Sequence, residues 1–280
     1  MSAIAIIGAG ELGGAIAHQL ARRDAVATIR LIDDRDRIAD GKSLDIMQAA
    51  PIEGFATELS GSTDLAAAGG ADIVIVADRA GGGEWQGEEA LQLVGRLHEL
   101  VQAAVILCAG AAQRDLIDRA VRERHLDRRR ILGTAPEALA AGARALVALA
   151  VDGSPRDVSL TVLGNPPAHV VVPWDDATLG GFRVTRLIDE VTRRRLVQRI
   201  AALWPPGPHA LAATAVKAVE AMTGRTRALV SCFVAPEEDA RHRARTTAVP
   251  VRLGAQGIDA VVLPDLSVID RVALDNATLL

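Results

Sequence analysis

The sequence lacks three features that would each indicate a class of protein. Its 280 residues include only two cysteines, Cys108 and Cys232, and both lie in apolar runs. They predict small buried side chains and exclude a disulfide framework or a cysteine metal site. The formal net charge is -4, which gives no general positive field to attract nucleic acid or an anionic membrane. No apolar run approaches the roughly 20 residues that span a bilayer.

The first apolar run is also short, because it covers only residues 3–7. A secretory leader needs a longer run, and we therefore expect a cytoplasmic protein. Half of the residues are hydrophobic, which excludes a mainly disordered chain. A chain of this length buries one large core or two ordinary ones.

Short apolar runs alternate with helical stretches through the first half of the chain. The runs DIVIVA and AVILCA are almost wholly apolar, as strands buried on both faces are. We predict strands over 3–7, 28–32, 55–60, 72–77, 104–109 and 130–132, with helices over 12–22, 36–49, 86–101 and 113–124. This alternation is typical of α/β proteins with a doubly wound parallel sheet, and it predicts a Rossmann domain over residues 1–134.

The second half mixes its elements in a different order. We predict helices over 137–150, 187–202 and 210–223, and strands over 158–163, 169–173, 227–235, 246–253 and 257–263. Asp265 is suited to cap a last helix from Leu266. The mixture predicts an α+β domain over residues 135–280.

The segment GAGELG places three glycines directly after the first strand and before the first helix. Gly8 permits a tight turn, Gly10 lets a pyrophosphate approach the backbone, and Gly13 lets the helix pack close to the sheet. The N–H groups at the helix N-terminus then face the phosphates. The same site is expected to include Glu11 and Leu12 from the helix start.

Asp33 ends the second predicted strand, and it is suited to accept hydrogen bonds from the ribose of adenosine. The pair Asp33–Asp34 would repel a 2′-phosphate, which favours NAD over NADP. Ala77 ends the fourth strand and is expected beside the dinucleotide. The alternative is a tight strand–helix turn that binds no ligand.

Several segments together resemble the lactate/malate dehydrogenases. They are GAGELGGAIA, LIDD, GKSLDIMQAAPIEGF, STDLAAAGGADIVIV, RILGTA, DVSLTVLG and ATLGGFRVTRLI. Residues 41–55 look most like the malate dehydrogenase branch, and the segment around 80–101 is shortened. The resemblance implies an N-terminal NAD domain, a C-terminal substrate domain, and a homodimer or homotetramer that acts on a small molecule.

The resemblance also implies a catalytic set, which this chain does not carry. The family protonates its keto acid with a histidine, orients that histidine with an aspartate, and holds the substrate carboxylate with an arginine. The corresponding positions here are Pro166, Leu139 and Gly142, and an asparagine position is Ala111. The mobile loop RAGGGEWQGEEA has no arginine after Arg79 to polarise a carbonyl.

Two histidines are weak candidates for a replacement acid. His169 lies three residues beyond Pro166, and His209 begins a predicted helix near the place where the family closes its substrate pocket. Each also suits an exposed structural position. On the cofactor side, Asp78–Arg79 stands where the family has small residues, and Asp78 would repel a pyrophosphate unless Arg79 compensates.

Two hypotheses follow from the sequence. In the first, the chain binds NAD but lacks ordinary malate or lactate dehydrogenase turnover. In the second, it is an active NAD-dependent oxidoreductase that acts on a 2-hydroxy acid or another small substrate through a rebuilt site. We predict no metal site.

Overall fold

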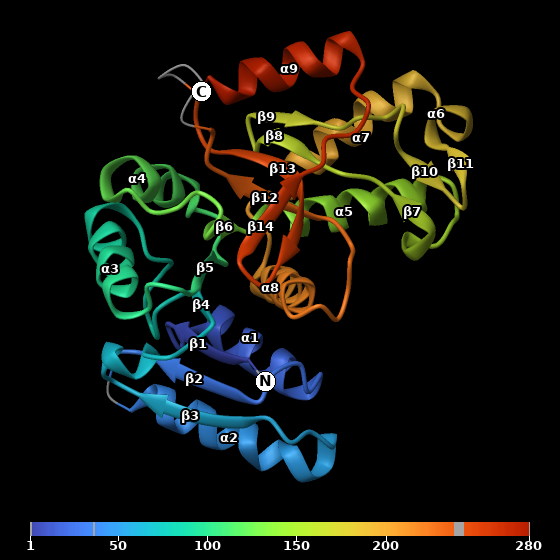
Figure 1. Ribbon diagram of the computed structural model, residues 1–280. Coiled ribbons are helices and arrows are strands. Elements are labelled where there is room, and N and C mark those ends of the chain that lie inside the picture. Colours follow the sequence, from blue (N-terminus) through green and yellow to red (C-terminus); the bar gives the residue numbers. More distant parts are fainter. Residues whose placement is uncertain (1, 36, 238–243, 280) are drawn as a thin grey trace.

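The computed structural model describes residues 2–35, 37–237 and 244–279 (Figure 1). The first half of the chain folds into β1 (Ala3–Ile7), α1 (Glu11–Arg22), β2 (Thr28–Ile32), α2 (Ile38–Glu53), β3 (Glu58–Ser62), β4 (Ile73–Val76), α3 (Gly87–Leu100), β5 (Val105–Cys108), α4 (Arg114–Arg124) and β6 (Ile131–Gly133). Strands and helices alternate as the sequence predicts.

The second half contains α5 (Ala135–Ala150), β7 (Val158–Ser159), β8 (Leu163–Asn165), β9 (His169–Val171), β10 (Thr178–Leu179), β11 (Phe182–Arg183), α6 (Val184–Leu187), α7 (Glu190–Ala201), α8 (Pro208–Met222), β12 (Val230–Val234), β13 (Thr247–Gly254), β14 (Gly257–Val261) and α9 (Val268–Thr278). Two single turns of 3₁₀ helix cover Leu65–Ala68 and Pro155–Asp157.

One large sheet carries the fold, in the strand order β3-β2-β1-β4-β5-β6-β12-β13-β8-β9. The first six strands are parallel, and their order is that of a doubly wound Rossmann sheet. Ile7 pairs with Ile32 on one side and with Val76 on the other, so the carboxyl ends of these strands meet at one edge. The predicted α/β fold class is confirmed.

The sheet continues past the parallel strands without a break. β12 pairs antiparallel with β6, at Phe233 and Gly133, and β13, β8 and β9 follow in antiparallel order. A separate small sheet is formed by β11, β10 and β7. The largest hydrophobic core cluster includes residues on both sides of position 134, among them Val219 on α8 and Val105 on β5.

Two local predictions are wrong. The expected strand over 158–163 is interrupted, because Leu160 and Val162 are buried in the second core cluster while the chain crosses from the small sheet to the large one. The last helix begins at Val268 and not at Leu266, because Ser267 and not Asp265 supplies its cap: Ser267 Oγ accepts from Asp270 N at 3.1 Å.

Other helix and strand boundaries differ from the predicted ones by a few residues. The third strand covers residues 58–62 where 55–60 was expected, and α2 continues through Pro51 to Glu53. The buried positions of Cys108 and Cys232 are confirmed, and neither forms a disulfide. Within the described residues, none of the helices has the length and apolar character needed to cross a bilayer.

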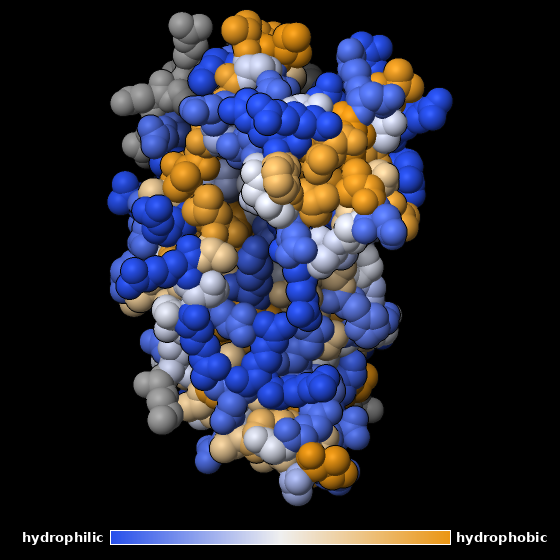
Figure 2. Space-filling view, turned by 90° about the vertical axis from the view of Figure 1, so that its right-hand side faces the viewer, coloured by the Kyte–Doolittle hydropathy of each residue, from blue (hydrophilic) through white to orange (hydrophobic). Residues whose placement is uncertain are grey.

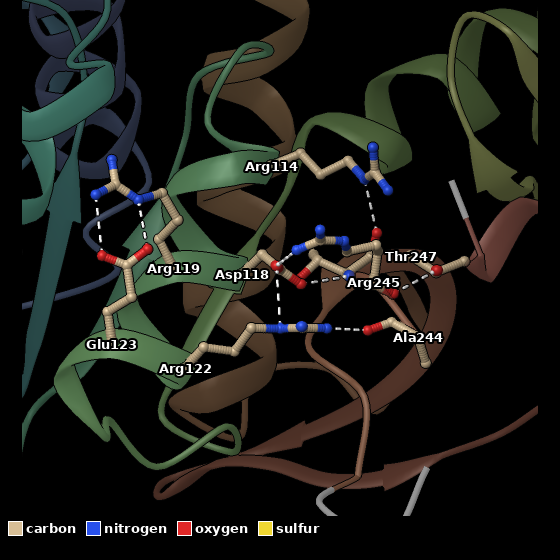
Figure 3. A network of polar contacts seen from close by, with 9 residues as sticks. Arg114, Asp118, Arg119, Arg122, Glu123, Ala244, Arg245 and Thr247 are labelled. Atoms are coloured by element: carbon tan, nitrogen blue, oxygen red, sulfur yellow. Dashed lines mark hydrogen bonds and ion pairs between the residues drawn. The ribbon is translucent and has the colours of Figure 1, made fainter. Parts of the chain in front are cut away.

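A buried carboxylate joins α4 to the chain that leads into β13 (Figure 3). Asp118 is only 4% exposed, and its carboxylate accepts from Thr246 N at 3.0 Å and from Arg245 Nη1 at 3.0 Å. Arg122 Nε lies 3.1 Å from the same carboxylate. This cluster fixes the C-terminal strands against the parallel sheet.

Candidate cofactor site

The glycine turn lies at the carboxyl edge of the sheet, between β1 and α1. Gly8 has a φ of +107°, and a Cβ added to Gly13 would lie 1.9 Å from the Gly8 carbonyl oxygen. Both positions therefore require glycine, as the sequence indicates. Lys42 Nζ on α2 donates to the Gly10 carbonyl at 2.6 Å and holds the turn from the other side.

Asp78, directly after β4, occupies the front of this turn. Its Oδ1 accepts from Gly13 N at 2.9 Å and its Oδ2 from Leu12 N at 3.2 Å. Its carbonyl accepts from Gly10 N at 2.9 Å. A Cβ added to Gly10 would lie 2.3 Å from Asp78 Cγ, so the carboxylate fills the space in front of Gly10. The donors at the N-terminus of α1 thus have a partner within the chain itself.

Asp33 is placed at the end of β2, as expected, but its carboxylate is only 4% exposed. Oδ2 accepts from Ala9 N at 2.7 Å and from Ala80 N at 2.8 Å, and Oδ1 accepts from Arg35 N at 3.0 Å. The carboxylate that sequence reasoning assigned to a ribose is therefore bonded to backbone N–H groups.

Glu84 is a site residue that sequence reasoning missed. Its two carboxylate oxygens accept from Ala111 N at 2.9 Å and from Ala112 N at 2.7 Å, just after β5. Asp78 and Glu84 form an antiparallel bridge, which closes the chain between them into a tight turn. We call residues 78–84 the plug segment. The only sequence signal for Glu84 was an acidic residue in a short glycine-rich loop.

Arg79 does not neutralise the negative charge of the Asp78 carboxylate. Its Nη1 lies 2.7 Å from Glu89 Oε1, and its guanidinium carbon lies 4.6 Å from the ring centroid of the buried Trp85. These contacts direct the positive charge toward α3. Among the ion pairs of the described residues, none includes Asp78.

The other expected cofactor positions surround the turn. Glu11 is exposed at the start of α1, and Leu12 is 3% exposed and belongs to the core. Ala77 is fully buried, and its Cβ would lie 3.5 Å from a Cβ at Gly13, so its small side chain permits the close approach of α1 to β4.

The resemblance assigns the family's catalytic positions to Leu139, Pro166, Gly142 and Ala111, and none of these four side chains is an acid, a base or a cation. Leu139 on α5 is fully buried in the second core cluster, and Pro166 is buried between β8 and β9. A Cβ added to Gly142 would lie 2.6 Å from Leu203 Cδ1, so Leu203 occupies that side of α5. Ala111 is 5% exposed, and its N–H is bonded to Glu84.

The two candidate histidines lie on different elements. His169 begins β9, where it pairs with Asn165 and is exposed. His209 is exposed in the first turn of α8 and lines a groove of about 470 Å³ with His18 and Lys42. His209 therefore faces a groove bordered by α1 and α2.

A second buried carboxylate, Glu137 on α5, was also missed by sequence reasoning. It is 2% exposed, and Oε1 lies 2.6 Å from both Arg144 Nη2 and Lys217 Nζ. Oε2 accepts from Ser231 N at 2.9 Å. Arg144 lies on α5 as well, and its side chain is half-buried.

Comparison with known proteins shows which proteins this chain resembles. Residues 2–119 match the family model described as lactate/malate dehydrogenase, NAD binding domain. The malate dehydrogenase of Desulforudis audaxviator is 28% identical over 294 residues, which cover 98% of this chain and 94% of that protein. The chain is thus similar to malate dehydrogenases along almost its whole length, and its first part matches the NAD-binding domain of the lactate/malate dehydrogenases. The matched model describes an NAD-binding domain, so NAD is the cofactor for domains of the type that residues 2–119 form.

Solved structures of the family share the fold. The malate dehydrogenase from Aeropyrum pernix superposes with a TM-score of 0.88 at 20% identity, covering 98% of this chain and 95% of that one. A lactate dehydrogenase from Cryptosporidium parvum, complexed with lactic acid and NAD, gives 0.87 at 22% identity and covers 99% and 94%. At these identities the likeness shows the architecture alone.

The turn that would bind NAD is present, but the plug segment occupies its hydrogen-bonding groups. The glycine turn, the start of α1 and Asp33 are all in the places where a dinucleotide-binding domain has them. The N–H groups of Leu12 and Gly13, however, are bonded to Asp78, and Asp33 is bonded to Ala80. With residues 78–84 in this position, the site does not fit a pyrophosphate.

Proposed function

We propose that this protein is a divergent member of the lactate/malate dehydrogenase family that binds NAD and has negligible malate or lactate dehydrogenase turnover. One feature of the sequence carries the proposal: when the chain is aligned with the family without gaps over residues 130–188, Pro166 falls at the position of the family's histidine. Proline has no ionisable group, so it cannot donate the proton that the substrate oxygen needs.

The surroundings of Pro166 support the proposal. Loss of the proton donor alone typically reduces the rate by ~10²–10⁴. Leu139 cannot orient or charge an imidazole, and Gly142 offers no guanidinium to hold a carboxylate. Positioning of a substrate supplies a large part of the rate enhancement, so the missing clamp adds to the deficit. These losses act within one unit and do not simply add.

An assay with oxaloacetate and with pyruvate tests the proposal. Steady-state oxidation of NADH is followed by absorbance, and the malate dehydrogenase of Desulforudis audaxviator serves as the positive control. We expect no turnover by the present chain above the background rate. Turnover above ~1 s⁻¹, near the low end of ordinary enzymes, would contradict the proposal and favour an active oxidoreductase with a rebuilt site.

Binding of NAD is tested separately, because it does not depend on turnover. NADH fluorescence is titrated against the protein up to millimolar cofactor. We expect saturable binding with a preference for NADH over NADPH. His169→Ala and His209→Ala are added if any turnover appears, since loss of that turnover in one variant would identify the replacement acid.

We further propose a cytoplasmic homodimer or homotetramer. The exposed apolar side chains of α2, Leu44 and Ile52, support an assembly, because they are 61% and 89% exposed in the single chain. Figure 2 shows that hydrophobic side chains also gather on the upper part of one face of the molecule, whereas the lower part of that face is mainly hydrophilic.

A further inference from the structure

We propose that residues 78–84 form an internal competitor of the dinucleotide: the Asp78 carboxylate takes the backbone donors at the start of α1 that a pyrophosphate would use, Glu84 covers the neighbouring strand end, and NAD binds only when this plug segment is displaced. The inference rests on the proposed NAD binding and describes its regulation.

The Asp78 carboxylate reproduces the chemistry of a phosphate at this place. A phosphate at the start of such a helix is bound by backbone N–H groups and by the positive end of the helix dipole. Asp78 takes both, since it accepts from Leu12 N at 3.2 Å and from Gly13 N at 2.9 Å. An anion at a helix N-terminus is stabilised by the helix dipole, and more strongly when the anion is partly buried. The same N–H groups cannot bind both anions at once, so a phosphate and the Asp78 carboxylate exclude one another.

Glu84 closes the neighbouring strand end in the same way. It accepts from the N–H groups of Ala111 and Ala112, which follow β5. A Cβ added to Gly110 would lie 2.2 Å from a Glu84 carboxylate oxygen, so this side chain lies directly on the backbone there. Glu84 thus covers the next strand end along the same edge of the sheet.

Asp33 holds the middle of the plug segment in place. Ala80 N donates to Asp33 Oδ2 at 2.8 Å, and this carboxylate is the group expected to bind ribose. A ribose hydroxyl and the Ala80 N–H therefore compete for the same oxygen. Together the three carboxylates couple displacement of the segment to occupation of the site.

Two positive charges near the glycine turn are already engaged. Arg79 is bonded to Glu89 and stacked on Trp85, and Lys42 donates to the Gly10 carbonyl at 2.6 Å. A bound dinucleotide would therefore bring its negative charge close to Asp78 without compensation from Arg79 or Lys42. Repulsion at short range in a partly buried site is substantial, which favours displacement of Asp78 over joint occupancy.

Removal of the Asp78 carboxylate tests the inference. Only the displaced form binds cofactor, so the apparent dissociation constant is the intrinsic one divided by the fraction displaced. We expect Asp78→Ala to bind NADH roughly tenfold or more tightly than wild type, and Asp78→Asn to fall between them. Asp175→Ala removes an exposed carboxylate outside the segment and should bind as wild type does.

Trp85 gives a second readout that is independent of affinity. It follows the plug segment and is 9% exposed, so its emission should change when the segment moves. We expect NADH to change tryptophan emission in wild type, to a smaller extent in Trp85→Phe, and we expect Asp78→Ala to show the changed emission without cofactor. Hydrogen exchange at Ala80 and Ala111 should rise in Asp78→Ala, and circular dichroism checks that the variant is folded.

The outcomes separate the two proposals. If wild type and Asp78→Ala bind NADH equally, the plug inference is overturned and the proposed NAD binding stands. If neither binds at millimolar NADH, then Asp78 is not the obstacle, and both the inference and the proposed NAD binding are overturned. If Asp78→Ala does not fold, Asp78→Asn with Glu84→Gln takes its place, and affinity unchanged from wild type overturns the inference.

Discussion

The Nζ atom of Lys217 on α8 lies 2.6 Å from Glu137 Oε1 near the start of α5. Arg144 Nη2 contacts the same oxygen at 2.6 Å, and the other oxygen accepts from Ser231 N on β12 at 2.9 Å. One buried carboxylate therefore connects two helices and a strand of the large sheet. Its burial is compensated by two cations that are themselves only partly buried.

Replacement of Glu137 should destabilise the protein strongly. Glu137→Gln leaves Lys217 and Arg144 without their anion, and breaking a buried pair costs roughly 3–5 kcal/mol. Both cations are partly exposed and can turn to water, so we expect the lower end of this range. Urea unfolding followed by circular dichroism measures the change. Glu190→Gln on α7 is the matched control, because its pair with Arg194 is exposed and should contribute roughly 0–1 kcal/mol. Equal effects in both variants would contradict a structural role for the cluster.

Asp33→Ala should alter both cofactor choice and the plug segment. The variant loses the predicted ribose contact and the repulsion of a 2′-phosphate, so NADH binding should weaken more than NADPH binding. It also leaves the N–H groups of Ala9, Ala80 and Arg35 without their acceptor. Titration of both cofactors gives the ratio of dissociation constants, and hydrogen exchange at Ala80 reports the loosened segment. A ratio unchanged from wild type would argue against the assigned ribose contact.

Stability should fall in mildly alkaline solution. Burial, with a smaller contribution from Glu84, raises the pKa of Cys108 from 9.0 to about 12, and burial likewise raises the pKa of Cys232. The folded protein keeps protons that the unfolded chain releases, so the unfolding free energy is greatest below pH 9 and decreases as the pH rises toward 12. The slope is at most about 1.4 kcal/mol per pH unit for each thiol.

Urea unfolding at pH 7.5, 9 and 10.5 measures this dependence. The sequence contains no tyrosine and only two lysines, Lys42 and Lys217, so few other groups titrate in this range. The double variant Cys108→Ala/Cys232→Ala should show a flatter pH dependence, whatever its stability at neutral pH. A slope identical to that of wild type would exclude the thiols as its source.

The apolar surface of α2 should carry subunit contacts. Leu44 and Ile52 are exposed on this helix, although its Ala39 and Ile46 are buried. We expect wild type to sediment as a dimer or tetramer at micromolar concentration, and Leu44→Glu/Ile52→Glu to sediment as a smaller species. Val268→Glu on α9 removes an equally exposed apolar side chain elsewhere and should leave the mass unchanged. A monomeric wild type would refute the assembly.

Much of the parallel sheet could be predicted from the sequence, for a physical reason. Strands buried on both faces, such as β4 and β5, are continuous apolar runs, and the glycines that permit the turn after β1 are visible as residue types. The antiparallel strands were harder. β10 and β11 have two residues each and are joined by Gly180–Gly181, and strands this short leave no periodic pattern to detect.

The site was only partly predictable. The sequence indicated that Asp78 conflicts with a pyrophosphate, but not that Asp78 would itself bond to Leu12 and Gly13. Glu84 and Glu137 were missed because their partners are backbone N–H groups and cations far along the chain, and such pairing has no local signature. The proline, leucine and glycine that the resemblance assigns to the catalytic positions could be read from the sequence, since that prediction needs only an alignment and the residue types.

The unbroken sheet also determines how a ligand can enter. β6 and β12 pair through Gly133 and Phe233, and α1 packs against α8 across the same junction. A hinge rotation of the two halves would have to break these backbone bonds and expose the buried Phe233. Under the proposed displacement of the plug segment, a ligand would therefore reach the carboxyl edge of the sheet by movement of a loop and not by a rigid-body opening. The two halves share one continuous sheet, and the plug segment after β4 is the part of the chain that has to move when a ligand enters.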